Sequence, residues 1–205
     1  LWAIKNGHLA VLQWARALGC QWDPQTCVYA AQSGQVAILQ LARAQGCPWH
    51  SGVCFMAAEC GHLEVLQWAR AQDPPCDWTQ STCEGAAKNG HLEVLQWAQA
   101  HGCPWAPAEC ISQAARYGHM AVLHWVVEVC GGGATTAAVV NAIGGGHLSV
   151  LQCLLTHDLA CFRECLLPAD VCDMAAGAGR LDILQWLRAK GCPWSRQTCD
   201  WAAEH

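Results

Sequence analysis

The chain has 205 residues, of which 53% are hydrophobic and only 13% are charged, a composition that excludes an intrinsically disordered protein. Its formal net charge is −5, so the chain lacks the excess of basic residues that attracts nucleic acid or an anionic membrane. The least charged stretch, residues 117–157, is interrupted by glycines and polar residues, so no run of about 18 apolar residues remains to span a membrane. We therefore expect neither nucleic acid nor a membrane as a partner.

One short phrase returns along the whole chain. Gly-His-Leu, followed by Val-Leu-Gln-Trp-Ala, begins at Gly7, Gly61 and Gly90. Steps of about 27 to 33 residues between copies are typical of repeat proteins in which each repeat is one supersecondary unit. We predict a single array over residues 1–205, degenerate at about 130–168, with both ends truncated inside a unit. Seven glycines mark the units: Gly7, Gly34, Gly61, Gly90, Gly118, Gly146 and Gly179.

Each unit predicts two helices. In the first unit the apolar residues of 9–18 recur at steps of three and four, which indicates a helix buried along one broad face. Gly19 follows this helix, where glycine suits a left-handed cap. The second helix is expected to begin at Asp23, and Thr79 and Ser195 are the matching caps of later units. The small residues expected on its buried side are Cys27, Ala30 and Ala31.

The later part of the chain is less regular. Glycine-rich segments near 131 and 144 predict a degenerate unit with a frayed or shortened helix between them. The unit after Gly146 is longer, and its extra residues, Leu159 to Pro168, predict a longer loop. No alternating pattern of β-branched residues predicts a strand. The expected fold is an all-α solenoid of stacked helix-turn-helix repeats, in which stacking buries the apolar face of each helix pair.

Residues 86–95, AAKNGHLEVL, closely resemble the ankyrin repeat, and weaker copies extend the resemblance over nearly the whole chain. The repeated ending Gly-Cys-Pro-Trp, at Gly46, Gly102 and Gly191, resembles a subset of short ankyrin-like repeats found in algal, oomycete and giant-virus proteins. The resemblance implies ankyrin-like repeats that hold protein partners.

Two departures from the ankyrin pattern affect the expected binding mode. The Thr-Pro-Leu-His start of the first helix is missing, since Thr26 stands in place of the proline and Cys27 in place of the leucine. The units are also several residues shorter than the roughly 33 residues of an ankyrin repeat. The deficit lies between Trp22 and Thr26, where the family's β-hairpin finger would project. We therefore expect these fingers to be mostly absent, replaced by tight turns, and the binding surface to be flatter.

Cysteine is abundant, with sixteen copies, and its recurrence with six intervening residues raises a zinc hypothesis. Structural zinc sites, however, normally use cysteines two to four residues apart. These cysteines also replace apolar residues of the ankyrin pattern, and cysteine packs well as a small hydrophobe. We favour structural, reduced cysteine over metal sites or disulfides and expect no cofactor. The pairs are Cys20 with Cys27, Cys47 with Cys54, Cys76 with Cys83, Cys103 with Cys110, Cys165 with Cys172, and Cys192 with Cys199.

Histidine and tryptophan also recur at fixed repeat positions. A catalytic base is needed once, beside a nucleophile, rather than once in each unit. No phosphate loop, nucleophile elbow or paired-carboxylate site occurs, so we predict that the chain is not an enzyme. We interpret the histidines as structural and the tryptophans as core and inter-unit packing. The histidines are His8, His62, His91, His119 and His147; the tryptophans are Trp14, Trp68, Trp97, Trp125 and Trp186 in one helix, and Trp22, Trp49, Trp78, Trp105 and Trp194 in the following turn.

The residues just before each marker glycine differ from unit to unit. On an ankyrin-like array they would line the open face of the stack, together with two aromatic residues about one turn earlier. We predict a non-catalytic, monomeric and cytoplasmic scaffold that binds a protein partner there. A zinc-binding Cys/His repeat protein and a structural spacer that targets a neighbouring effector domain are the alternatives. The predicted partner-binding residues are Tyr29, Gln32, Ser33, Phe55, Glu59, Lys88, Asn89, Arg116 and Tyr117.

Overall fold

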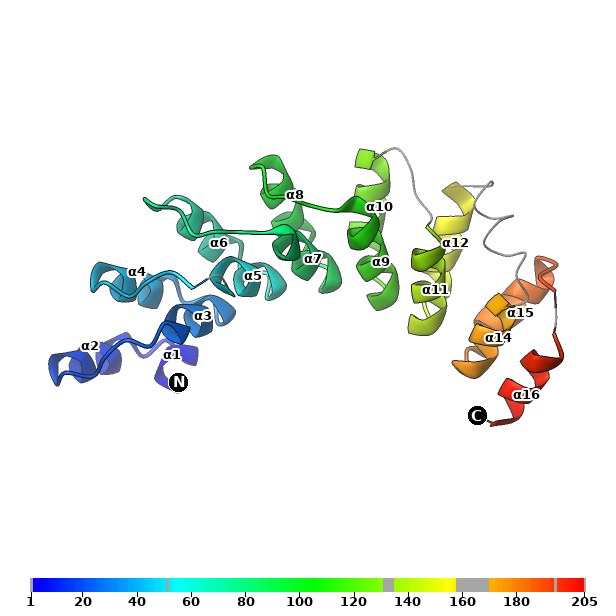
Figure 1. Cartoon of the computed structure of the whole chain (residues 1–205), viewed down its shortest axis with the longest axis horizontal. Coiled ribbons are helices and arrows are strands. Elements are labelled where there is room, and N and C mark those ends of the chain that lie inside the picture. Colours follow the sequence, from blue (N-terminus) through cyan, green and yellow to red (C-terminus); the bar gives the residue numbers. More distant parts are fainter. Residues whose placement is uncertain (1, 51, 131–134, 158–169, 194, 205) are drawn as a thin grey trace. The chain divides into compact units, whose positions relative to one another are not determined.

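The computed structural model describes residues 2–50, 52–130, 135–157, 170–193 and 195–204 (Figure 1). Every regular element within these ranges is a helix, as the repeat pattern predicts. The chain divides into two compact units, Leu1–Ala106 and Pro107–His205. No helix in the described ranges combines the length and the apolar character needed to cross a membrane.

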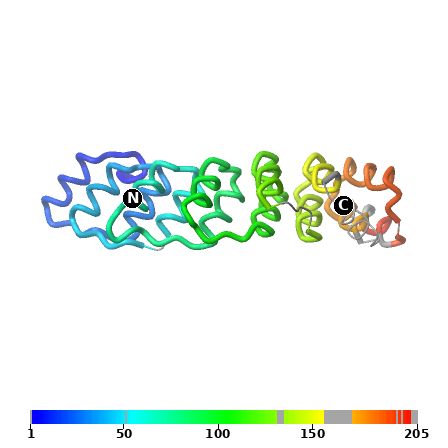
Figure 2. The backbone as a smooth tube through the Cα atoms, turned by 90° about the horizontal axis from the view of Figure 1, so that it is seen from above, coloured from blue at the N-terminus to red at the C-terminus, as the bar shows by residue number. Residues whose placement is uncertain are grey.

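The first unit is a row of helix pairs, each made of an inner helix and the outer helix that follows it. Neighbouring inner helices contact one another, and each contacts its own outer helix (Figures 1 and 2). The inner helices are α1 (Trp2–Lys5), α3 (Gln25–Gln32), α5 (Gly52–Glu59) and α7 (Gln80–Lys88). The outer helices are α2 (Leu9–Ala17), α4 (Val36–Ala44), α6 (Leu63–Arg70) and α8 (Leu92–Ala100).

The second unit repeats this plan. Its inner helices contact each other in chain order, from α9 to α11, from α11 to α14 and from α14 to α16. The inner helices are α9 (Pro107–Tyr117), α11 (Thr136–Gly145), α14 (Asp170–Gly177) and α16 (Arg196–Glu204). The outer helices are α10 (Met120–Cys130), α12 (Leu148–His157) and α15 (Leu181–Ala189).

The marker glycines turn the chain from an inner helix to its outer helix. Gly61 has a φ of +78°, a left-handed conformation that other residues adopt only with strain. Its N–H donates to the Ala58 carbonyl at 3.2 Å, and the next N–H, of His62, donates to the Ala57 carbonyl at 2.8 Å. This paired arrangement satisfies two carbonyls at the helix end. The left-handed cap predicted at Gly19 is also confirmed, with a φ of +90°.

Polar side chains begin several inner helices, as predicted. The Gln25 N–H donates to Asp23 Oδ1 at 2.9 Å before α3. Before α7, the Thr79 N–H donates to Thr82 Oγ1 at 3.4 Å within a reciprocal capping box. Before α16, Ser195 Oγ accepts the Thr198 N–H at 3.1 Å, and the Ser195 N–H returns the bond to Thr198 Oγ1. These bonds satisfy N–H groups that lack helical partners.

Where the structure describes the connection from an outer helix to the next inner helix, it is a turn rather than a β-hairpin finger. No strand occurs in the described residues of these connections, which confirms the prediction. An arginine near the end of the outer helix holds the turn in the first three helix pairs. Arg43 Nη1 donates to the Cys47 carbonyl at 2.5 Å, and its guanidinium lies 4.5 Å from the Trp49 ring centroid. The Arg70 guanidinium makes the same two contacts, with the Cys76 carbonyl and with the Trp78 ring. The cation–π contact and the charge-assisted bond together stabilise the turn.

The core runs between the inner and outer helices. Leu66 and Leu95 on the outer helices are fully buried, as is the alanine pair of each internal inner helix in the first unit. The first outer helix differs from the prediction. Residues 9–18 were expected to be buried along a broad face, but Val11 of α2 is 53% exposed whereas its equivalent Val65 of α6 is 1% exposed. The difference follows from position in the first unit. Helix α2 lies at the end of the row of described outer helices, beside α4, while α6 lies between α4 and α8 (Figure 1).

The shortened helix expected in the degenerate unit is not observed. Helix α11 has ten residues, two more than α3 or α5. Thr135 Oγ1 accepts the Ala138 N–H at 3.1 Å at its start, and Ala142 and Ile143 are fully buried against neighbouring helices. Burial and a good cap therefore outweigh the low helix propensity of the glycines that follow. The predicted loop at Leu159 to Pro168, with Cys161 and Cys165, lies outside the described residues.

Candidate binding face

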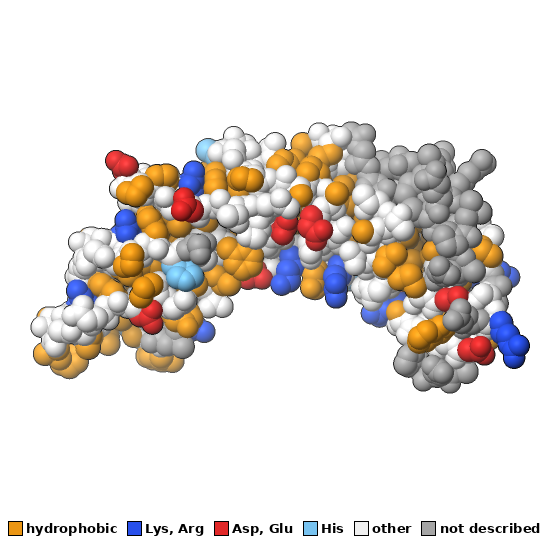
Figure 3. Space-filling view, viewed as in Figure 1, with side chains coloured by type: hydrophobic (Ala, Val, Ile, Leu, Met, Phe, Trp, Pro, Cys, Tyr) orange, Lys and Arg blue, Asp and Glu red, His pale blue; other side chains and the backbone are white. Residues whose placement is uncertain are grey.

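The open face of the first unit is formed by inner helices α3, α5 and α7 and the residues directly after them. Each predicted partner-binding residue on it is half-buried or exposed. Figure 3 shows only a few charged side chains on the visible side of this unit, scattered among hydrophobic and uncharged ones. The open face carries Tyr29, Gln32, Ser33, Phe55, Glu59, Lys88 and Asn89.

Two of these residues form an ion pair between neighbouring inner helices. Lys88 Nζ lies 3.2 Å from Glu59 Oε1, and the two side chains are 41% and 23% exposed. Gly85 of α7 makes this approach possible, because a Cβ there would lie 3.1 Å from the Phe55 ring and 3.4 Å from Glu59 Cβ. The role of Gly85 was not predicted from the repeat pattern. The sequence feature that could have indicated it is a glycine inside an inner helix, at the position that Tyr29 and Met56 occupy in the preceding helix pairs.

Other open-face residues are partly engaged with their own unit. The Lys5 ammonium lies 6.0 Å from the centroid of the Tyr29 ring, a contact from α1 that the sequence analysis did not foresee. Asn89 Nδ2 donates to the Gly85 carbonyl at 3.1 Å and so satisfies the end of α7. The Gln32 side chain is exposed. The open face therefore offers aromatic, amide and charged groups held in place by intramolecular contacts.

The last two predicted residues belong to the second unit. Arg116 and Tyr117 are both exposed at the end of α9, and the Arg116 guanidinium lies 6.0 Å from the Tyr117 ring centroid. Helix α11 approaches here, because a Cβ on Gly145 would lie 2.3 Å from the Arg116 carbonyl oxygen. As on the open face of the first unit, a glycine allows close packing beside the variable positions.

The repeated histidines connect successive helix pairs. His91 Nε2 is hydrogen-bonded to the Glu59 carbonyl at 3.1 Å, and His62 Nε2 makes the same bond to the Gln32 carbonyl. Each ring also covers the marker glycine of the preceding pair: a Cβ on Gly61 would lie 2.6 Å from His91 Nδ1. These contacts confirm the structural interpretation for His62 and His91. They also explain why glycine and histidine recur together.

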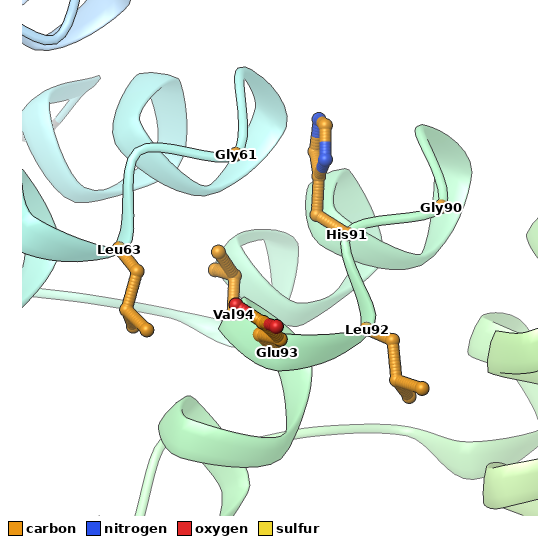
Figure 4. A pocket seen from close by; sticks show the side chains of 7 residues that line it. All are labelled: Gly61, Leu63, Gly90, His91, Leu92, Glu93 and Val94. Atoms are coloured by element: carbon orange, nitrogen blue, oxygen red, sulfur yellow. The ribbon is translucent and has the colours of Figure 1, made fainter.

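A groove opens where these loops meet. It has a volume of about 380 Å³ and is lined by Gly61, Leu63, His91, Glu93 and neighbouring residues (Figure 4). The groove lies between the helix-to-helix turns of two successive pairs, and the His91 ring stands beside it with one nitrogen already bonded. None of the predicted partner-binding residues lines it. We therefore assign the groove to the junction between pairs rather than to the open face.

The tryptophans pack between successive helix pairs, as predicted, although they do so near the surface. The Trp49 ring, in the turn after α4, lies 6.0 Å from the Trp68 ring of the next outer helix. Trp78 and Trp97 repeat the arrangement at 5.9 Å. All four side chains are half-buried. Trp14 does not fit the core interpretation, because it is 66% exposed on α2.

Most of the cysteines that the structure describes are buried, and the contact of Cys27 is not with the cysteine that the sequence spacing emphasises. Cys27 and its equivalents Cys54 and Cys83 are fully buried, which confirms their role as small core residues. Cys20 is exposed, and the Cys27 thiol instead donates to Cys47 Sγ at 3.5 Å. Within the described ranges no three or more His, Cys, Asp or Glu side chains gather as metal ligands would.

The similarity of this chain to known proteins lies in its fold. No model of a known protein family matches the chain, and neither does any curated protein sequence. Among solved structures, the ankyrin repeat domain of human ASB11 is similar, with a TM-score of 0.62 and 17% sequence identity, and the match covers 94% of this chain and 97% of that domain. At this identity the likeness concerns the fold alone. The chain therefore has the fold of an ankyrin repeat array.

Proposed function

We propose that this array is a non-catalytic scaffold that binds a protein partner on its open face. Ankyrin repeat folds generally serve as protein interaction scaffolds. The observation that carries the proposal is the contrast between repeated and variable positions. Buried alanines, cysteines and leucines repeat from pair to pair, whereas an open-face position changes from Gln32 to Glu59 to Lys88 without any demand from the core.

The chemistry of the open face indicates the kind of partner. Tyr29 and Phe55 are rigid aromatic side chains, a type enriched at the centre of protein interfaces. The Glu59 and Lys88 charges compensate one another, so the partner needs polar complementarity rather than a strong opposite charge. Because the described residues form no β-hairpin finger, we expect the partner to contact helices and short turns. We infer a flat protein surface as the partner and expect no membrane or nucleic acid.

The proposal extends to the setting of the protein. The Gly-Cys-Pro-Trp endings support the short-repeat subset of ankyrin-like proteins. The burial of repeated cysteines as small core residues supports a reducing compartment, for which we propose the cytoplasm. We propose a monomer because the recurring apolar faces of the internal pairs are covered within the chain.

Selection from a display library of protein fragments encoded by the source genome tests the proposal. Tyr29→Ala and Phe55→Ala should each weaken the binding of a selected fragment about tenfold or more, equivalent to roughly 1.4 kcal/mol or more of binding free energy. Gln67→Ala on the exposed side of α6 is the matched control and should leave affinity unchanged. If a fragment loses affinity for Gln67→Ala and not for the two aromatic variants, it binds elsewhere on the array. A library that yields no binders would favour the spacer function.

The ion pair allows a finer test of the same face. Lys88→Glu places a second carboxylate beside Glu59 and should weaken a genuine open-face partner. The exchanged variant, Glu59→Lys with Lys88→Glu, keeps an ion pair of reversed direction and so preserves the local packing. If both variants lose affinity, the partner recognises the charges; if only the single variant does, the partner depends on the local packing. Unchanged affinity in both, measured by titration calorimetry, would exclude this part of the face.

A further inference from the structure

Four pairs of cysteines join an inner helix to the turn that follows the outer helix of the same pair. The first member lies on the inner helix, and the second lies in the turn about 20 residues later. Both members of every pair are buried, with exposures from 0% to 4%. We call these the paired thiols: Cys27 with Cys47, Cys54 with Cys76, Cys83 with Cys103, and Cys172 with Cys192.

The members of each pair lie within hydrogen-bonding reach of one another. The Cys27 thiol donates to Cys47 Sγ at 3.5 Å. The Cys54 thiol donates to the Cys76 carbonyl at 3.7 Å. In the Cys83 and Cys172 pairs a hydrogen bond between the two side chains contributes to their pKa values. In three of the pairs the turn cysteine is also held from the other side, because its carbonyl accepts a hydrogen bond from an arginine of the outer helix, as Cys47 does from Arg43. The arrangement recurs in both units.

We propose that the paired thiols are oxidation sites that hydrogen peroxide converts to disulfides within single helix pairs. A disulfide has a sulfur–sulfur distance of about 2.05 Å, so the Cys27 and Cys47 sulfurs must approach by about 1.5 Å. Rotation of two cysteine side chains, with a small shift of the turn, supplies a displacement of that size. The backbone of the helix pair stays in place.

The reaction balances with peroxide as the only oxidant. The thiolate of one cysteine attacks a peroxide oxygen, the O–O bond breaks, and the departing hydroxide takes up a proton as water. The resulting sulfenic acid is then attacked by the second thiol: the S–S bond forms, the S–O bond breaks, and a second water leaves. Two thiols lose two electrons in total, and one peroxide is reduced to two waters.

The protonation of the two thiols is unequal in the first unit. The hydrogen bond between Cys54 and Cys76 raises the pKa of the Cys54 thiol and lowers that of the Cys76 thiol. The corresponding bond from Cys83 lowers the pKa of the Cys103 thiol. The turn cysteine of these two pairs is therefore more readily ionised than an ordinary thiol, and the thiolate is the nucleophile in thiol oxidation.

In the pair of the second unit, burial outweighs the hydrogen bond from Cys192, which lowers the pKa of the Cys172 thiol. Burial raises the pKa of the Cys172 thiol, and burial raises the pKa of the Cys192 thiol to about 11. We therefore expect the Cys54 and Cys83 pairs to close before the Cys172 pair. The consequence of closure is local: each bond ties the inner helix to the turn of its own pair and leaves the contacts between pairs unchanged.

Mass spectrometry of the oxidised chain tests the proposal. The full chain is treated with peroxide under native conditions, alkylated after unfolding, digested without reduction and mapped. We expect linked peptides for the four pairs, and a rise of about 5 °C in the thermal midpoint that dithiothreitol reverses. Linkages between cysteines seven residues apart, or oxidation confined to exposed thiols such as Cys20 and Cys130, would overturn the proposal.

Single variants separate pairing from general reactivity. In Cys47→Ser, Cys27 should be recovered in alkylated form while the other three pairs still link, which also shows that the rest of the chain is folded. Cys60→Ser is the matched control, because Cys60 is half-buried and outside the pairs, and all four linkages should remain. If Cys27 instead links to another cysteine in Cys47→Ser, the contacts seen here do not direct the oxidation, and the proposal fails.

Discussion

In the first unit, outer helices α4, α6 and α8 bury an alanine at the position where those of the second unit bury a larger aliphatic residue. Ala69 in α6 corresponds to Leu154 in α12, and both are almost fully buried. The preceding position can change in the opposite direction, since Trp68 corresponds to Cys153, whose thiol lies 3.5 Å from His124 Nε2. The equivalent residues are Ala42, Ala69 and Ala98 in the first unit and Val126, Leu154 and Leu187 in the second.

The inner helices show a related difference. The position of Cys27 in α3 is taken by Ile111 in α9 and Val139 in α11, all buried. The left-handed marker glycine is instead common to both units. The contrast teaches that the backbone turn is the invariant part of the repeat, whereas side-chain volume can be redistributed as long as the interior stays densely packed.

The largest expected effect comes from reversing the volume difference. Leu154→Ala should destabilise the chain by about 3 kcal/mol, because it leaves a cavity at a site that is 1% exposed. Ala69→Leu should cost about 2 kcal/mol by overpacking the first unit. Urea unfolding followed by circular dichroism measures both. A stabilising Ala69→Leu would show that the first unit has unfilled space, and the comparison between the units would then be wrong.

The next effect concerns the shared glycine turn. Gly61→Ala should cost about 2 to 3 kcal/mol, because the left-handed backbone strains alanine and the new Cβ displaces the hydrogen-bonded His91 ring. Gly102→Ala is the matched control, with a φ of +80° and no heavy atom within 4 Å of the added Cβ. It should cost only the backbone strain, about 1 kcal/mol. Equal losses in the two unfolding curves would remove the histidine from the explanation.

Sequence periodicity predicted the features that repeat, because units next to each other in the chain are next to each other in the stack. The helix pairs, the caps at Thr79 and Ser195 and the left-handed glycines follow from local pattern. The thiol contacts do not. Cys27 meets Cys47 only after the helix pair closes, while the conspicuous spacing of Cys20 and Cys27 joins two different pairs.

The same limit applies to the open face. Its positions could be listed from the sequence because they vary, but the ion pair between Glu59 and Lys88 depends on how closely α5 approaches α7. That approach is determined by a single residue, Gly85. Helix α11 is the converse case: its glycines predicted a weak helix, and burial of Ala142 and Ile143 overrode that local preference.

A smaller effect is expected where an arginine holds the turn. Arg70→Ala should cost about 1 to 2 kcal/mol, because it removes both the bond to the Cys76 carbonyl and the contact 4.0 Å from the Trp78 ring. The helix pair that contains α8 has Gln99 at the position of Arg70. Gln99→Arg therefore tests whether adding an arginine beside Trp105 stabilises that turn. It should raise stability by about 0.5 to 1 kcal/mol in the same urea assay. A loss of stability would mean that this turn is built differently from its neighbours.

The smallest effect tests how the second unit replaces the histidine. Arg180 stands at the position of His91, and its Nη2 donates to the Gly144 carbonyl at 3.4 Å, while its buried Nε has no hydrogen-bond partner within the described part of the chain. Arg180→His should stabilise the second unit by about 0.5 to 1 kcal/mol, because it removes an unsatisfied buried donor and restores the bond that His91 makes. His91→Arg makes the opposite change in the first unit and should cost a similar amount. If urea unfolding shows that Arg180→His destabilises the chain, the arginine makes a contribution at this junction that a histidine cannot replace, and the two units differ there in more than side-chain identity.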